Sequence, residues 1–166
     1  MNSHNKNIVC MGEAMVEFTR VEDQKGEALY IRGLGGDTSN CAISAARQGA
    51  NVAYLSSVGN DQFGNVAMDM WSKEGIDVSH ISINPGYPTG IYFIEPVPEG
   101  RNFTYYRKES AASKMTLTSD ARTLLSGEVI LHLSAISQAI SATAKELSFD
   151  AIDLVKQNGG MLSYDT

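Results

Sequence analysis

The sequence predicts an α/β domain with a mainly parallel sheet and a smaller β layer beside it. Short apolar runs alternate with segments of helical periodicity, as in layered α/β domains. Residues 13–32 and 87–108 break this pattern, because apolar and polar residues alternate there with a period of two, as in antiparallel strands. The length of 166 residues suits one domain.

Four apolar runs predict the buried strands of the parallel sheet. Each run is four to seven residues long, which is about the usual length of a strand. Turn-forming residues such as glycine lie at the ends of several runs. The predicted strands are Ile8–Gly12, Val52–Val58, Val129–Leu133 and Met161–Tyr164.

Three segments predict helices between these strands. The first, Asn40–Gln48, is rich in small residues and is closed by Gly49. The second begins at Asp61, a suitable N-cap, and runs to about Glu74. Its apolar face consists of Phe63, Val66, Ala67, Met70 and Trp71. The third helix is Ala142–Gln157.

The extra β layer suggests a lid over a binding site. In its second segment the period of two places Phe103, Tyr105 and Arg107 on one face, with Thr104 and Tyr106 on the other. Exposed strand edges pair readily with other chains, so we expect a homo-oligomer formed through this lid.

Composition excludes several classes of function. The net charge is −6, which argues against nucleic-acid and anionic-membrane partners, since both favour a basic excess. No run approaches the roughly 20 apolar residues of a membrane helix. Cys10 and Cys41 form no disulfide framework, and no Cys/His spacing suggests a metal site. We therefore expect a reduced, cytoplasmic setting.

The turn at residues 32–40 is the most informative segment. Gly35 and Gly36 permit positive φ angles and close approach of a ligand to the backbone. Asp37 and Asn40 are short polar residues suited to sugar hydroxyls, and the helix start after them offers free N–H groups. A simple tight turn with an N-cap explains the same pattern. The segment is neither a Walker P-loop nor a complete dinucleotide fingerprint.

A longer stretch of the sequence resembles a known family. Its double glycine, small-residue helix and Val58-Gly59-x-Asp61-x-x-Gly64 pattern are similar to the N-terminal signature of the ribokinase-like (PfkB) sugar kinases. The resemblance implies a three-layer α/β/α, Rossmann-like body with a small β-sheet lid. Residues 1–166 would be the N-terminal part of one kinase domain, truncated on its C-terminal side, with lid strands at about 13–34 and 87–108.

Within the family, three segments resemble the 2-dehydro-3-deoxygluconate kinases. They are Thr89-Gly-Ile-Tyr92, the run from Phe103 to Ala111 and Leu131-His-Leu-Ser-Ala-Ile136. This resemblance implies that a sugar acid contacts Gly36, Tyr92, Tyr105, Arg107 and Ile136. In many relatives an acidic residue at the position of Glu13 also lies against the sugar.

The chemistry of Arg107 fits that role. A guanidinium binds a carboxylate through two parallel hydrogen bonds, which lysine cannot reproduce. Tyr105 is predicted on the same face and can point into the same site. The alternative for both is an exposed β face with a solvated charge. For Glu13 the alternative is an exposed carboxylate at a strand end.

The resemblance implies ATP-dependent phosphorylation of a small-molecule sugar acid with Mg²⁺, in which an aspartate of a Gly-Ala-Gly-Asp segment acts as the base. The 166 residues contain no such segment, so we expect this chain alone to be inactive. Another PfkB sugar kinase, of fructokinase or ribokinase type, is one alternative. A non-catalytic sugar-binding or dimerisation fragment is another. A dehydrogenase is disfavoured, because the dinucleotide motif is incomplete.

Overall fold

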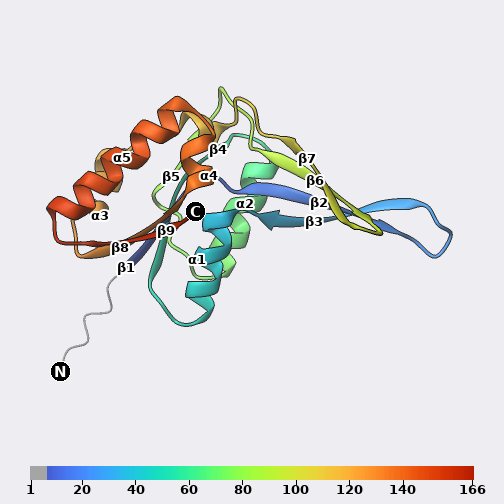
Figure 1. Ribbon diagram of the computed structural model, residues 1–166, viewed down its shortest axis with the longest axis horizontal. Coiled ribbons are helices and arrows are strands. Elements are labelled where there is room, and N and C mark those ends of the chain that lie inside the picture. Colours follow the sequence, from blue (N-terminus) through green and yellow to red (C-terminus); the bar gives the residue numbers. More distant parts are fainter. Residues whose placement is uncertain (1–6) are drawn as a thin grey trace.

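The computed structural model describes residues 7–166, which form a three-layer body and a second sheet that projects from it (Figure 1). The body contains a five-stranded sheet in the order β5-β4-β1-β8-β9. All neighbouring strands in this sheet pair in parallel. The strands are β1 (Asn7–Met11), β4 (Val52–Gly59), β5 (Ile81–Asn84), β8 (Val129–Ser134) and β9 (Met161–Asp165).

Helices cover both faces of the body sheet, as the two apolar cores show. Val9 and Met11 of β1 pack into a core with α3 (Ser119–Leu125) and α5 (Ala142–Gln157). Cys10 points to the opposite face, into a core with α1 (Asp37–Arg47) and α2 (Gln62–Lys73). This alternation along one strand confirms the predicted α/β/α layering. The short helices are α4 (Ala135–Ala139) and the 3₁₀ helix η1 (Ala111–Lys114).

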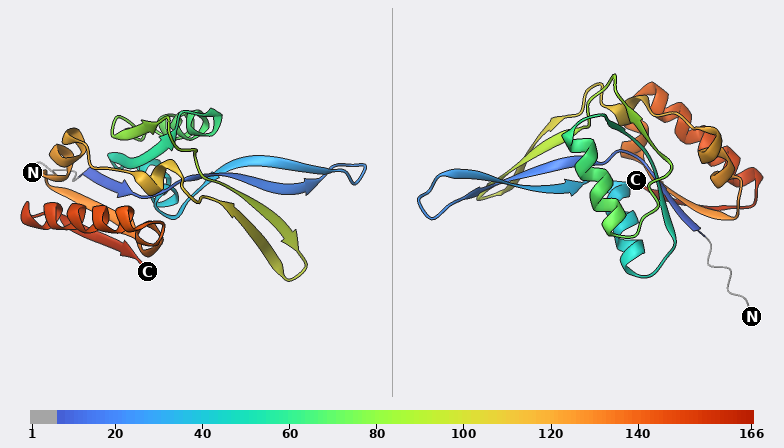
Figure 2. Two further views of the ribbon diagram at one scale, coloured as in Figure 1. Left: turned by 90° about the horizontal axis from the view of Figure 1, so that it is seen from above. Right: turned by 180° about the vertical axis from the view of Figure 1, so that it is seen from behind.

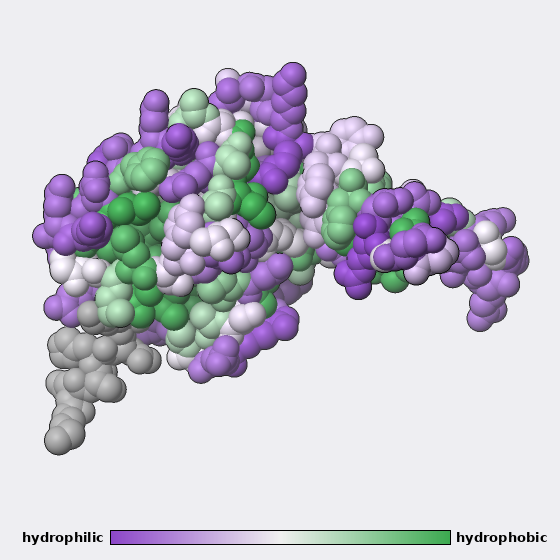
Figure 3. Space-filling view, viewed as in Figure 1, coloured by the Kyte–Doolittle hydropathy of each residue, from purple (hydrophilic) through white to green (hydrophobic). Residues whose placement is uncertain are grey.

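We call the second sheet the projecting sheet. Its four strands lie in the order β3-β2-β6-β7. They are β2 (Met15–Glu22), β3 (Ala28–Gly35), β6 (Ile91–Val97) and β7 (Gly100–Tyr106). β2 with β3 and β6 with β7 form antiparallel hairpins, whereas β2 and β6 pair in parallel. The hairpins are joined near the body and diverge toward their tips (Figure 2). Hydrophilic residues dominate the far tip (Figure 3).

The predicted elements agree with the structure apart from their ends. The first helix begins at Asp37 rather than Asn40, because β3 ends at Gly35 and Gly36 is the N-cap of the helix. Four short elements had no clear signal in the sequence. These are β5, η1, α3 and α4.

Asp61 connects the body to the projecting sheet. As predicted, it caps α2, accepting hydrogen bonds from the N–H groups of Phe63 at 3.0 Å and Gly64 at 2.8 Å. Its second oxygen accepts from the N–H of Thr89 at 2.8 Å, just before β6. Partial burial raises the pKa of Asp61, but the hydrogen bonds together outweigh burial and lower the pKa from its ordinary value. One carboxylate thereby fixes the entry to β6 relative to α2. None of the described helices combines the length and hydropathy needed to cross a bilayer.

Candidate functional site

A cavity of about 160 Å³ lies where the projecting sheet meets the body. Its walls come from the segment after β1, the start of α1, the projecting sheet and α4. All the predicted site residues except Gly35 line it. The lining residues are Glu13, Met15, Gly36, Asp37, Asn40, Tyr92, Phe103, Tyr105, Arg107 and Ile136.

Gly36 brings the backbone of α1 close to the segment after β1. Its φ angle is 135°, a conformation that favours glycine. A Cβ at this position would stand 2.7 Å from the carbonyl oxygen of Glu13 and 3.0 Å from Cα of Ala14. The start of α1 therefore packs against this turn only if residue 36 has no side chain.

Asp37 is the first residue of α1 and faces the cavity. The hydroxyl of Ser134, at the end of β8, donates a hydrogen bond to its carboxylate. Burial raises the pKa of Asp37, while the N–H groups of Thr38 and of Asp37 itself oppose the rise. A half-buried carboxylate of this kind can accept hydrogen bonds from ligand hydroxyls.

Glu13 is the most deeply buried acid of the cavity, with an exposed fraction of 2%. It forms an ion pair with Arg107 and accepts a hydrogen bond from the hydroxyl of Ser110 at 2.5 Å. Burial raises its pKa, while Arg107 and Ser110 lower it. The alternative of an exposed carboxylate at a strand end is therefore wrong for Glu13, since both partners cover it.

Arg107 follows β7 and reaches back to the body. Its side chain is 25% exposed although it is paired with Glu13, while Nε and Nη2 of the guanidinium are buried and make no hydrogen bond to the described residues. Arg107 is the only cation among the lining residues, beside the carboxylates of Glu13 and Asp37. Lys108 lines the two neighbouring cavities.

Tyr92 forms the wall on the projecting sheet and is buried, with its hydroxyl donating a hydrogen bond to Glu17. Burial and the neighbouring Glu17 both raise its pKa well above the ordinary value. Gly35 does not line the cavity. A Cβ at Gly35 would overlap the Tyr92 hydroxyl, so this glycine leaves room for the phenol. The φ angle of Gly35 is not positive, so the glycine is needed for the space it leaves to Tyr92 and not for its conformational freedom.

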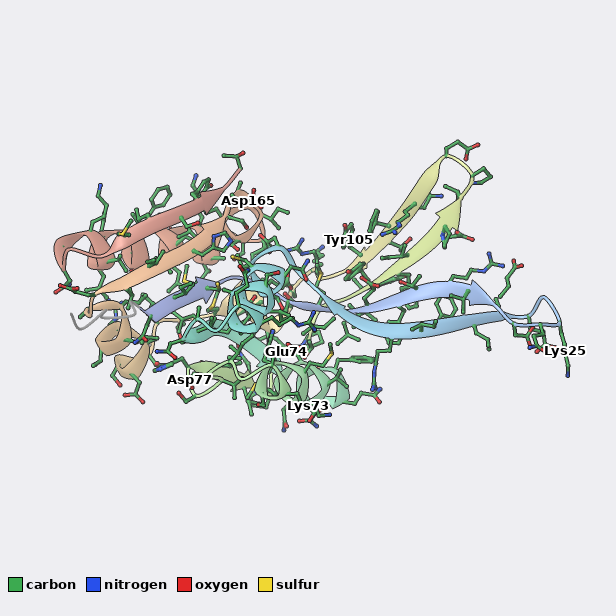
Figure 4. All side chains as sticks on the ribbon, turned by 90° about the horizontal axis from the view of Figure 1, so that it is seen from below. Lys25, Lys73, Glu74, Asp77, Tyr105 and Asp165 are labelled. Atoms are coloured by element: carbon green, nitrogen blue, oxygen red, sulfur yellow. The ribbon has the colours of Figure 1, made fainter. Side chains whose placement is uncertain are left out.

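Aromatic rings form a stacked row beside Tyr92. The ring centroids of Tyr92 and Tyr105 are 5.6 Å apart. Those of Phe103 and Tyr105 are 6.1 Å apart, and the planes of these two rings are nearly parallel, with an angle of 9° between them. This confirms that Phe103 and Tyr105 share one face. Tyr105 is 52% exposed and lies near the base of the projecting sheet (Figure 4). The row offers a flat apolar surface next to the polar groups of α1.

Sequence reasoning missed three residues that hold the site together: Glu17, Ser110 and Ser134. Each bonds to a predicted site residue from a distant part of the chain. Glu17 alone carried a local signal, since it is a charged residue in an alternating strand. Ser110 and Ser134 lie in segments that resemble the family, but no local pattern identified their partners, which depend on the tertiary fold.

The chain matches a protein-family model over residues 5–166, and that model describes the pfkB family carbohydrate kinases. The chain belongs to this family. Its curated relatives include 2-dehydro-3-deoxygluconokinases of Bacillus subtilis, 35% identical, and Thermoproteus tenax, 31% identical. The matches cover 96% and 91% of this chain. A probable fructokinase-2 of Arabidopsis thaliana is 28% identical over 99% of the chain.

Solved structures of pfkB proteins share the fold. A PfkB protein from Polaromonas sp. JS666 has a TM-score of 0.85 at 30% identity, covering 96% of this chain and 54% of its own. Fructokinase from Xylella fastidiosa with bound ATP has a TM-score of 0.86 at 22% identity, covering 97% of this chain and 51% of its own. The chain also spans only about half the length of the curated relatives, with 50% and 48% of the two 2-dehydro-3-deoxygluconokinases matched.

Proposed function

We propose that this pfkB chain is the sugar-binding half of an ATP-dependent kinase that phosphorylates 2-dehydro-3-deoxy-D-gluconate to its 6-phosphate. The observation that carries the proposal is the position of Arg107 at a cavity whose other walls are hydroxyl-binding, aromatic and aliphatic groups. The relatives named 2-dehydro-3-deoxygluconokinase support the same substrate.

In this proposal the two ends of the cavity bind different groups of the sugar acid. Arg107 takes the carboxylate, because a guanidinium offers paired donors, and its Nε and Nη2 make no hydrogen bond within residues 7–166. Asp37 and Asn40, at the start of α1, bind hydroxyls, and Gly36 lets the ligand approach the backbone. Tyr105 and Ile136 close the cavity with apolar surface, and the projecting sheet acts as the lid.

The reaction would be in-line attack of the primary hydroxyl on the γ-phosphate of ATP, for which these residues bind and orient the acceptor. Mg²⁺ would neutralise phosphate charge in such a reaction. Among residues 7–166 no group of three or more metal-ligating side chains is found, so we assign no ligand for the ion within them. We also assign no catalytic base within these residues, and we propose that the 166-residue chain alone does not turn over.

Calorimetric titration of the chain with 2-dehydro-3-deoxy-D-gluconate and with D-fructose tests the proposal. We expect saturable binding of the sugar acid and weaker binding of D-fructose. Absence of sugar-acid binding would contradict the sugar-binding role. A coupled assay for ADP release tests the second part, and robust turnover by this chain would refute its inactivity.

A fructokinase-type substrate is the second candidate, and the charge of the cavity favours it. Glu13 and Asp37 place two carboxylates beside one guanidinium, and Arg107 is already paired with Glu13. Such a site suits a neutral, hydroxyl-rich sugar. Tighter binding of D-fructose than of the sugar acid in the same titration would select this candidate.

We also propose that the chain associates through the projecting sheet. β3 is an edge strand, and three consecutive large apolar residues on it are more than half exposed. These residues are Leu29, Tyr30 and Ile31. Analytical ultracentrifugation with and without sugar acid tests this. Dimers together with no sugar binding would favour a non-catalytic assembly module, and a monomer at all concentrations would contradict the association.

A further inference from the structure

Glu17 does not line the cavity, but it accepts a hydrogen bond from Tyr92, which does line it. Glu17 of β2 and Tyr92 of β6 are direct partners in the parallel register, so their side chains share one face of the projecting sheet. The Tyr92 hydroxyl donates to the Glu17 carboxylate, and the hydroxyl of Thr19 donates to the same carboxylate at 2.8 Å. Two donors converge on Glu17, as expected for an ionised acceptor.

This arrangement determines which hydrogen bonds the Tyr92 hydroxyl can donate and accept. A phenol has one O–H donor, and in Tyr92 that donor is directed at Glu17. What remains on the oxygen is acceptor capacity. The ring cannot easily turn away, because it is buried and stacked on Tyr105. The hydroxyl also fits only because Gly35 has no Cβ. The sheet therefore holds Tyr92, a residue of the cavity wall, with its O–H directed at Glu17 and acceptor capacity left on its oxygen.

We propose that Glu17 is a positioning residue. By accepting the O–H of Tyr92, it leaves the Tyr92 oxygen able only to accept a hydrogen bond from the substrate. The group of the substrate that binds there is then a hydroxyl and not a carboxylate. The substrate-reading part of this inference rests on the proposed sugar-binding function. A carboxylate has no hydrogen to donate to Tyr92, so it would be excluded from this wall and directed to Arg107. Glu17 would thus set the orientation of a sugar acid without touching it.

The first experiment needs no ligand. Tyrosine labelled with ¹³C at Cζ gives an NMR signal that responds to the hydrogen bond of the phenol, and loss of a signal in Y92F identifies Tyr92. We expect this signal to shift between about pH 7 and pH 3, where carboxylates take up protons, and to lose most of the shift in E17Q. E22Q carries the same substitution at the exposed end of β2 and should behave as wild type.

The effects of other ionisable groups on the Tyr92 signal must be distinguished from the effect of Glu17. Tyr105 of β7 stacks on Tyr92, while Glu13, Asp37 and Arg107 line the same cavity. Their effects on the Tyr92 signal persist in E17Q, whereas the effect of Glu17 does not. A Tyr92 signal that titrates equally in wild type and E17Q would overturn the role of Glu17.

The second experiment tests substrate reading by calorimetry with 2-dehydro-3-deoxy-D-gluconate. We expect E17L and Y92F each to weaken binding about two- to tenfold, the effect of one hydrogen bond, with E22L unchanged. E17L is used here because leucine cannot accept the O–H of Tyr92, whereas the glutamine of E17Q still can. Unaltered affinity in E17L would overturn the substrate-reading part. If the wild-type chain binds no sugar acid, the proposed function fails, and with it the substrate-reading part, while the NMR titration still decides whether Glu17 positions Tyr92.

Discussion

Glu13 and Arg107 form an ion pair that ties the turn between β1 and β2 to the chain leaving β7. The pair lies where the body meets the projecting sheet, and Ser110 adds a hydrogen bond to the same carboxylate. Because the exposed fraction of Glu13 is only 2%, water cannot replace either partner. The pair therefore links the stability of the fold to the shape of the cavity.

Removing the carboxylate should destabilise the protein strongly. E13A leaves Arg107 without its partner, and we expect the free energy of unfolding to fall by about 2–3 kcal/mol, less than for a fully buried pair because Arg107 is partly exposed. S110A removes the hydrogen bond to Glu13 and the longer one from the N–H of Ser113 at 3.4 Å, and should cost about 1 kcal/mol. Urea denaturation measures both. Equal losses in the two variants would show that the ion pair contributes nothing beyond the hydrogen bond.

The raised pKa of Glu13 also predicts how stability depends on pH. A carboxyl whose pKa is higher in the folded state binds more protons there, so its contribution to the free energy of unfolding falls as pH rises from its ordinary pKa through its folded pKa. Asp37 has a raised pKa and acts in the same direction. Urea denaturation from pH 4 upward should therefore show a decline that is smaller in E13Q. An identical slope in E13Q would contradict the raised pKa.

The sequence predicted the layers of the fold, and the residues that line the cavity, better than the contacts between distant elements. Buried strands and amphipathic helices have local sequence patterns. The alternation of residues along the strand likewise predicted that Phe103 and Tyr105 share one face. The parallel pairing of β2 with β6 has no local signal, because it depends on where two distant hairpins meet. Without that register, neither the partner of Tyr92 nor the role of Gly35 as space for its hydroxyl could be predicted.

Gly35 gives a test of that packing. In G35A the new Cβ would stand 2.9 Å from Cζ of Tyr92 and closer to its hydroxyl, so the phenol must move and lose Glu17. We expect the unfolding free energy to fall by about 1–3 kcal/mol. G33A is the matched control on β3, because its nearest contact is Glu17 Oε1 at 3.6 Å, an ordinary distance. It should change stability by less than about 0.5 kcal/mol. Equal effects would argue against the packing role.

Arg107 gives the decisive test of the proposed substrate class. R107K keeps a cation that can pair with Glu13 but loses the two-pronged donor geometry, so the fold should survive while sugar-acid binding weakens by roughly 1–2 kcal/mol. R107A should cost about 2–3 kcal/mol of binding. Arg101 near the tip of β7 is exposed and outside the cavity, so R101A serves as the control.

Titrating wild type, R107K, R107A and R101A with 2-dehydro-3-deoxy-D-gluconate and D-fructose separates charge recognition from shape. If Arg107 binds the carboxylate, R107K loses affinity for the sugar acid and keeps its affinity for D-fructose, which has no group that needs a cation. Urea denaturation of each variant accounts for any loss of folded protein, a real concern for R107A because it leaves Glu13 buried and unpaired. Parallel loss for both sugars in stably folded R107K would mean that Arg107 shapes the cavity through Glu13, and the sugar-acid assignment would fall.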